Sequence, residues 1–279
     1  MSVFHLKDLE KAIQFCNQLS QIRTLFLTST NDFHLTELLE SIHTSKEYAG
    51  EVHQLDVLAK LCPQVVLTFE KDIAIDRNWC AISKVALTKD LRVTVDGCNR
   101  VLSGRQRFLA FLIESGTIEF RRISIVRCGH SKAQQGGAIR ILGDASTVVL
   151  RNMTFVNCEG HSGIIYVDTH AQMKLQGCVF LHCVAAFHGS CVFNKGYSVL
   201  STSTFSHCRS GGLGGAVFND QVASVDIASC DFRQCFAAML GGAVFNSSRG
   251  LILLADNNWE SNETEVLKGK AGSFYQEMD

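Results

Sequence analysis

Residues 198–219 read SVLSTSTFSHCRSGGLGGAVFN, and residues 225–246 read VDIASCDFRQCFAAMLGGAVFN. The two stretches align without a gap at an offset of 27 residues. Each contains an alternating apolar segment, an aromatic residue three positions before a cysteine, and a Gly-Gly-Ala-Val-Phe-Asn motif. A period of about 20–50 residues is typical of solenoid proteins, in which each repeat packs against its neighbours.

The alternating segment recurs in six gapless copies along the C-terminal two-thirds of the chain. Its anchor residue is spaced by 30, 25, 25, 27 and 27 residues, at Ile125, Phe155, Phe180, Phe205, Phe232 and Trp259. A seventh, weaker copy ends at Val95 and Cys98. Apolar residues recur at steps of two, as in Val148 and Leu150, which is the period of a strand. The sequence therefore predicts an all-β fold: a right-handed parallel β-helix of about seven coils over residues 65–279, with coils ~4.8 Å apart.

Stacking of coils explains the residue types at the repeated positions. The glycine pairs that begin at Gly136, Gly214 and Gly241 permit positive φ at a corner. Asn194, Asn219 and Asn246 would form a ladder of side-chain amides. A column of cysteines would end in Asn262; its members are Cys98, Cys128, Cys158, Cys183, Cys208 and Cys235. These are interpreted as buried free thiols, with vertical disulfides as the alternative.

The N-terminal third has a different pattern. Residues 5–20 have apolar residues near helical spacing, and further helices are predicted at 35–42 and 52–61, before Pro63. Short strands are predicted at 22–28, 65–69 and 73–75. Because the ends of a β-helix expose unpaired backbone and core, residues 1–64 are predicted to form an α/β cap. The alternative is a separate helical domain.

Composition limits the classes of partner. The net charge is −1, without a block of like charges, which argues against nucleic acid and anionic membranes. The longest apolar runs, such as residues 108–113, are far shorter than the ~20 residues of a membrane-spanning helix. Residues 1–9 do not resemble a secretory leader. These features lead us to expect a cytoplasmic protein.

One column of side chains is the candidate binding surface. It follows the Gly-Gly motifs and consists of Arg140, Tyr166, Phe193, Phe218, Phe245 and Tyr275. If Val192, Val217 and Val244 face inward, this column faces outward and could stack on sugar rings or bind a partner protein. In the opposite phase the aromatic residues belong to the core. Both alternatives remain open at this point.

Catalytic and metal sites have weaker signals. Asp168 and Asp220 occupy equivalent turns two coils apart, with Lys195 between them, and are the candidates for a polysaccharide-cleaving site. Solvated turn residues are the alternative. A group of zinc-type ligands lies within 14 residues: Cys178, Cys183, His188 and Cys191. Because two of these cysteines fall at core positions of the repeat, no metal is predicted, and no glycine loop that would hold a phosphate cofactor is found.

The motifs resemble the repeats of the chlamydial polymorphic outer-membrane proteins, which carry Gly-Gly-Ala-Ile/Val alternating with Phe-x-x-Asn. The first motif is intact at 136–139, 214–217 and 241–244, whereas the second is mostly Phe-x-x-Cys. The resemblance covers about residues 95–275 and implies a surface-displayed, adhesive β-helix. The expected function is thus a non-catalytic binding or structural module whose partner is a polysaccharide or a surface protein. The alternative is a polysaccharide lyase or glycoside hydrolase on the same scaffold.

Overall fold

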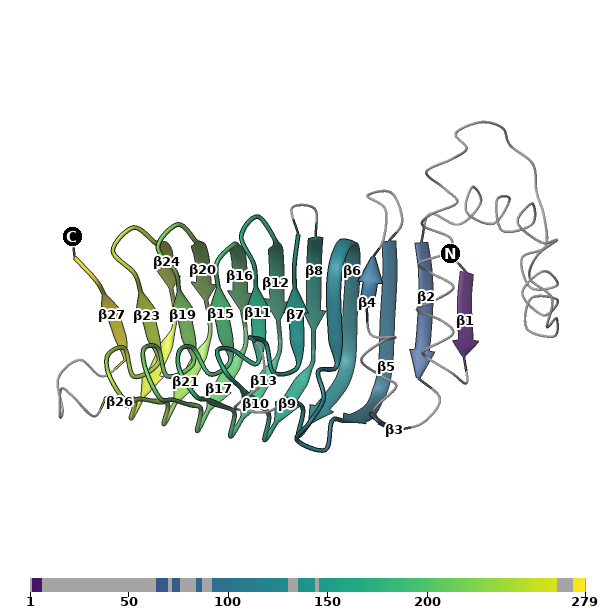
Figure 1. The fold of residues 1–279 in the computed structure, drawn as a ribbon, viewed down its shortest axis with the longest axis horizontal. Helices are drawn as coiled ribbons and strands as arrows, with labels where there is room; N and C mark the ends of the chain where they lie inside the picture. Colours follow the sequence, from purple (N-terminus) through teal and green to yellow (C-terminus); the bar gives the residue numbers. More distant parts are fainter. Residues whose placement is uncertain are drawn as a thin grey trace.

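The computed structural model describes residues 2–6, 64–69, 72–75, 84–86, 92–129, 135–143, 146–264 and 273–278. Every element in these segments is a β-strand, and neighbouring turns of the chain pair in parallel. The strands lie side by side along one long axis (Figure 1). These observations confirm the predicted parallel β-helix. Within the described segments, no helix is long and apolar enough to cross a membrane.

Each regular turn contributes four strands to three faces. Face A holds the long strands β8 (Ser146–Arg151), β12 (Gln172–Gln176), β16 (Tyr197–Ser201), β20 (Ser224–Ala228) and β24 (Leu251–Ala255). It continues, after a bend, into β9 (Thr154–Val156), β13 (Val179–Leu181), β17 (Thr204–Ser206), β21 (Asp231–Arg233) and β25 (Asn258–Glu260).

The other two faces are narrower. Face C holds β10 (Glu159–Gly160), β14 (Val184–Ala185), β18 (Arg209–Ser210), β22 (Phe236–Ala237) and β26 (Glu263–Thr264). Face B holds β7 (Ile139–Ile141), β11 (Ile165–Val167), β15 (Val192–Asn194), β19 (Val217–Asn219), β23 (Val244–Asn246) and β27 (Phe274–Gln276). The turn from face B to the next face A has two residues after β15 and four after β19.

Left-handed residues fix the bends at the same place in every turn. The bend within face A has φ between 47° and 63° at Arg122, Asn152, Gly177, Thr202, Ser229 and Asp256. The bend into face C has φ between 50° and 55° at Arg127, Asn157, His182, His207, Gln234 and Ser261. The first glycine of each Gly-Gly motif also has positive φ, as predicted. A Cβ on Gly214 would lie 2.2 Å from the carbonyl oxygen of Val217, so only glycine fits there.

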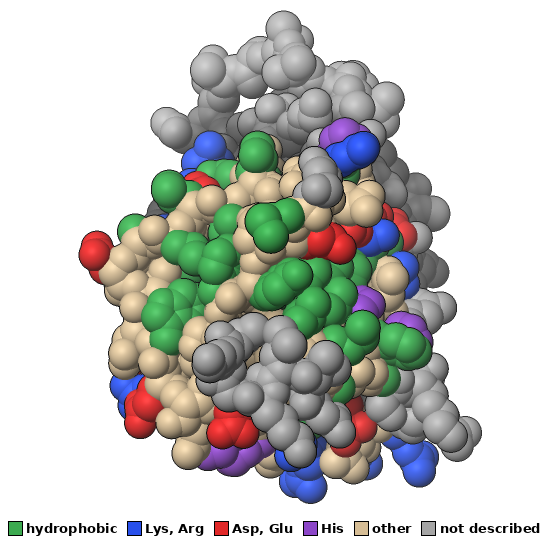
Figure 2. Space-filling view, turned by 90° about the vertical axis from the view of Figure 1, so that its left-hand side faces the viewer, with side chains coloured by type: hydrophobic (Ala, Val, Ile, Leu, Met, Phe, Trp, Pro, Cys, Tyr) green, Lys and Arg blue, Asp and Glu red, His purple; other side chains and the backbone are tan. Residues whose placement is uncertain are grey.

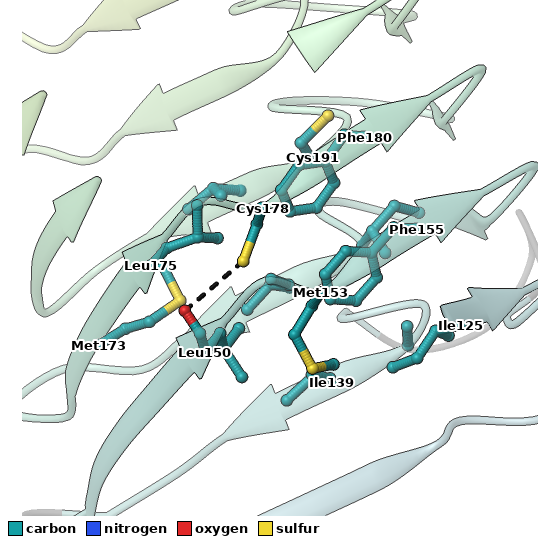
Figure 3. Close-up of a cluster of buried hydrophobic side chains, with 14 of the residues drawn as sticks. Ile125, Ile139, Leu150, Met153, Phe155, Met173, Leu175, Cys178, Phe180 and Cys191 are labelled. Atoms are coloured by element: carbon teal, nitrogen blue, oxygen red, sulfur yellow. Dashed lines mark hydrogen bonds between the residues drawn. The ribbon is translucent and has the colours of Figure 1, made fainter. Parts of the chain in front are cut away.

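The interior is a set of stacked columns. The predicted anchors pair in register, Ile125 with Phe155 and so on to Trp259. Ring centroids from Phe155 to Trp259 lie 4.5–5.0 Å apart with nearly parallel planes. Figure 3 shows Phe155 and Phe180 stacked beside the apolar side chains of the neighbouring columns. Burial of this continuous core stabilises the solenoid by ~25 cal/mol per Å² of apolar surface.

Five of the predicted column cysteines are buried side by side. They are Cys128, Cys158, Cys183, Cys208 and Cys235, and the structure describes them as free thiols. From Cys158 onward, each sulfur lies 3.4–3.7 Å from the carbonyl oxygen of the anchor residue one turn earlier. Asn262 ends the column, as predicted, and its side-chain oxygen accepts from the backbone N–H of Cys235 at 2.9 Å.

The assignment of Cys98 to this column was wrong. β5 (Arg92–Ser103) and β6 (Phe111–Val126) pair Leu102, and not Val95, with Ile125. The register shifts after Asp96, where residues 97–99 lengthen the bend. Cys98 is exposed in this bend, and its N–H donates to the Asp96 carboxylate at 3.0 Å. A gapless alignment cannot detect such a lengthened bend.

The amide ladder is confirmed. Asn194 donates to Asn219 at 2.7 Å, Asn219 donates to Asn246 at 2.6 Å, and Asn246 donates to Gln276 at 2.5 Å. The hydroxyl of Ser198 donates to the side-chain oxygen Oδ1 of Asn194 at 2.8 Å. All three asparagines are completely buried, so these bonds replace the water that each amide loses on folding.

The N-terminal part is described only at its strands. β2 (Gln64–Phe69) and β3 (Ile73–Ala74) lie where strands were predicted, and β4 (Lys84–Ala86) pairs with β6. Residues 2–6 form β1 (Ser2–Leu6), which pairs in parallel with β2. The start of the predicted first helix at residues 5 and 6 is therefore strand. The remaining predictions for residues 7–63, including the cap or separate helical domain, lie outside the described residues.

Candidate functional surface: the outer side of face B

The predicted aromatic column is in register on face B. Arg140 pairs with Tyr166, and the pairing continues through Phe193, Phe218 and Phe245 to Tyr275. Centroids of successive rings from Tyr166 onward lie 4.9–5.6 Å apart. The residues on either side of each ring, such as Val192 and Asn194, are buried in the interior. The column therefore points outward from the solenoid.

The column is nevertheless covered. Tyr166, Phe193, Phe218 and Phe245 are only 2–6% exposed and form a second, small hydrophobic cluster. Partly buried leucines pack over it: Leu142, Leu213 and Leu240. The sequence suggested either an exposed outward column or a column in the core. The rings in fact face outward and are nevertheless buried. The sequence feature that could have indicated this burial is the leucine directly before the Gly-Gly motif, at Leu213 and Leu240.

The two ends of the column are less covered. Arg140 and Tyr275 are half-buried. The guanidinium of Arg140 lies 5.7 Å from the centroid of the Tyr166 ring, a cation–π contact. The four central rings of the column expose little surface to solvent. Ligand binding by the column, from Arg140 to Tyr275, stays a prediction.

His188 packs over the column at a gap left by a glycine. A Cβ on Gly212 would lie 2.6 Å from His188 Nδ1, so the imidazole occupies the space that a side chain would need. Nδ1 accepts from the backbone N–H of Leu213 at 3.0 Å, and the ring stacks on Phe218 at 4.9 Å. Burial lowers the pKa of His188, which favours the neutral ring with Nε2 as its donor.

The exposed apolar side chains nearby lie at the corner between faces C and B. Phe187 is 49% exposed and Met239 is 47% exposed. These residues lie at the same corner of successive turns. The backbone N–H of Phe187 donates to the backbone carbonyl oxygen of His161, and that of Met239 donates to the backbone carbonyl oxygen of Gly212. The rings of His161 and Phe187 are in contact, with centroids 4.4 Å apart and planes tilted by 44°. We call His161, Phe187, His188 and Met239 the corner ridge. No repeated residue type marks Phe187 and Met239 in the sequence.

The candidate catalytic residues line up on successive turns. Lys195 N–H donates to Val167 and Asp220 N–H donates to Asn194, so Lys195 lies between Asp168 and Asp220 as the repeat predicts. Lys195 Nζ is 3.7 Å from the Asp220 carboxylate. Asp168 accepts from the Tyr166 hydroxyl at 3.2 Å; burial, together with this carboxylate, raises the pKa of Tyr166 to about 12. Two turns separate the carboxylates by ~10 Å, slightly beyond the ~5–9.5 Å of glycoside hydrolases.

The zinc-type ligands do not converge. Cys178 lies in the column of Met153, where its sulfur is 3.5 Å from the Leu150 carbonyl oxygen (Figure 3). Cys183 and Cys191 are buried in the interior, whereas His188 packs outside face B. Among the described residues, no group of three or more His, Cys, Asp or Glu side chains is arranged to hold a metal ion.

The outer side of face B thus carries a covered aromatic column. A row of charges follows it in the turns toward face A, and an exposed ridge of aromatic, histidine and methionine side chains lies at its corner with face C. Such a surface can offer ring contacts and hydrogen-bond donors to a ligand. Comparison of the chain with protein-family models, with curated proteins and with solved structures found no match.

Proposed function

We propose that this protein is a non-catalytic β-solenoid binding module whose corner ridge contacts carbohydrate. The observation that carries the proposal is the exposed ring of Phe187, flanked by His161 and His188 on a rigid scaffold. A sugar has an apolar ring face and a rim of hydroxyls, so an aromatic ring with nearby imidazole donors complements it. The resemblance to chlamydial outer-membrane repeats supports an adhesive role of this kind.

The state of the charged residues supports binding over cleavage. Lys195 is engaged with Asp220, and Asp168 with Tyr166. Hydrolysis with two carboxylates needs them ~5–9.5 Å apart, whereas these two lie two turns apart, ~10 Å by the spacing of the strands. The enzyme reading rests on the alignment of Asp168, Lys195 and Asp220 alone, and a reducing-sugar release assay on soluble polysaccharides tests it.

Calorimetric titration with soluble neutral, amino and uronic-acid oligosaccharides tests the binding proposal. We expect saturable binding that Phe187→Ser weakens at least about tenfold, the effect of losing ~1.4 kcal/mol. Tyr197→Ser is the matched control, because Tyr197 is a partly exposed ring on face A, 38% exposed. Equal losses in both variants, or no binding to any of the three classes, would overturn carbohydrate recognition at the ridge.

A further inference from the structure

Two histidine side chains lie in contact on the outside of the solenoid, at the bend into face C. His182 and His207 occupy the same position on neighbouring turns, since Leu181 and Ser206 directly before them pair in register. Both histidines are exposed, and their ring centroids are 4.9 Å apart with planes tilted by 43°. The other described residues of this column carry no imidazole: Arg127, Asn157, Gln234 and Ser261. A view along the long axis shows histidine side chains at the edge of the molecule, where solvent reaches them (Figure 2).

The backbone holds both histidine side chains in the same direction. His182 and His207 have φ of 53° and 55°, within the left-handed region that forms each of these bends. The residues that follow, Cys183 and Cys208, are completely buried in the interior column, and the exposed histidines before them project outward. A scaffold that already holds two side chains together loses little conformational entropy when a ligand binds both of them.

The hydrogen bonds of the two histidines leave a lone pair on each ring. His207 Nδ1 lies 2.8 Å from the Ser206 hydroxyl oxygen. When Nδ1 donates to this oxygen, Nε2 keeps its lone pair, and a bond of this kind orients the imidazoles that bind metals in proteins. Among the described residues, His182 has no side-chain hydrogen bond. One nitrogen of the neutral imidazole is an acceptor, so His182 also has a nitrogen available for an ion.

The separation of the two rings suits an ion held between them. A bond from a first-row metal ion to an imidazole nitrogen is ~2.1 Å long, and the ring centre lies ~1.1 Å behind that nitrogen. Two rings bound to one ion therefore have centres ~4.5 Å apart at a right angle and ~5.2 Å apart at a tetrahedral angle. The observed 4.9 Å falls between these values. Since the ring torsion of an exposed histidine is broad, small rotations bring both nitrogens toward one point.

We propose that His182 and His207 bind one divalent transition-metal ion between two turns of the solenoid. Imidazole is a suitable ligand for Zn²⁺, Ni²⁺ and Cu²⁺, and water completes the coordination of the ion. The site needs only two protein ligands, so it agrees with the finding that no larger group of ligands converges among the described residues. It uses none of the zinc-type ligands discussed above and no residue of the corner ridge. Because the ion contacts two successive turns of the folded chain, it should stabilise their pairing.

Calorimetric titration of the purified full chain with Ni²⁺ tests the site. We expect saturable binding that His182→Asn and His207→Asn each weaken at least about tenfold, because either variant leaves a single imidazole. Asparagine is suited to this bend, since Asn157 occupies it one turn before His182 with φ of 52°. His170→Asn is the matched control, because His170 is exposed, has φ of 66° and lies in the turn between β11 and β12. That variant should bind Ni²⁺ as tightly as wild type.

Thermal unfolding gives a second measurement of the same site. Saturating Ni²⁺ should raise the unfolding temperature of wild type and of His170→Asn, and should raise it less in His182→Asn and His207→Asn. Circular dichroism before the titration establishes that each variant is folded. The proposal fails if wild type shows no saturable binding, if only one of the two column variants loses affinity or neither does, or if His170→Asn loses as much as they do.

Discussion

At the scale of single residues, the same side-chain hydrogen bond recurs in successive turns and stabilises the fold. Asn219 shows this most clearly: its amide donates to Asn246 and to the carbonyl oxygens of Ala223 and Leu251, and it accepts from Asn194. The ladder closes the corner between faces B and A in successive turns. Since the site is completely buried, no water can replace a missing amide.

Replacing Asn219 with alanine should therefore destabilise the protein by about 2–4 kcal/mol, because several buried groups lose their partners at once. Urea unfolding followed by circular dichroism measures the change. Asn258→Ala provides the control, since Asn258 is exposed and its bond to Asp231 lies at the surface. That variant should stay within ~0.5 kcal/mol of wild type. Similar losses in the two variants would contradict a structural role of the ladder.

Residue types at repeated positions were predictable because stacking imposes the same requirement in each turn. The ladder, the anchors and the positive-φ glycines follow from spacing alone. Cys98 was not predictable, since residues 97–99 lengthen one bend and shift the register. Phe187 was missed for another reason. The corners after β14, β18 and β22 have six residues each, but their second position holds Phe187, Gly212 and Met239, so no residue type repeats there.

At the scale of one structural element, the side chains of one column share the same degree of burial. The cysteine columns are completely enclosed by neighbouring turns, and only Cys98, in its lengthened bend, is exposed among the described cysteines. The aromatic column of face B is enclosed as well, by leucines of the adjoining corner. The alternation of residues along a strand predicts whether a side chain points into the solenoid or away from it. Whether an outward side chain is buried depends on other residues of the same turn, here the leucines that cover it.

We expect a soluble maleimide near pH 8 to modify Cys98 in the native protein and to spare the buried cysteines. Thiolate is the reactive species; burial raises the pKa of Cys178 to about 12 and that of Cys230 to about 11. Peptide mass spectrometry identifies the labelled sites, and labelling in concentrated urea shows that all are reactive when exposed. Modification of Cys178 as fast as Cys98 under native conditions would argue against the enclosed column.

The described part of the molecule is a one-dimensional stack, in which the strands of each turn pair with those of the neighbouring turns. A central turn is supported on both sides, and the last described turn on one. Phe205 stacks on Phe180 and Phe232, whereas the described ring that stacks on Trp259 is Phe232. The loss of stability when an aromatic side chain is replaced by alanine should therefore depend on the position of its turn along the axis.

Phe205→Ala should cost about 3–5 kcal/mol, since it leaves a cavity between two rings. Trp259→Ala should cost only about 1–2 kcal/mol, because that side chain is partly exposed and loses less buried area. Thermal unfolding of the two variants, compared with wild type, measures the order. A larger loss for Trp259→Ala would contradict the nearest-neighbour account.

The unequal turns between face B and face A carry a consequence for how such a chain can change over time. Two residues after β15 and four after β19 join the same pair of faces, yet the amide ladder continues unbroken across both. Insertions at these corners therefore leave the interior where it is. Evolution can vary the loops that the protein displays while conserving the spine that carries them.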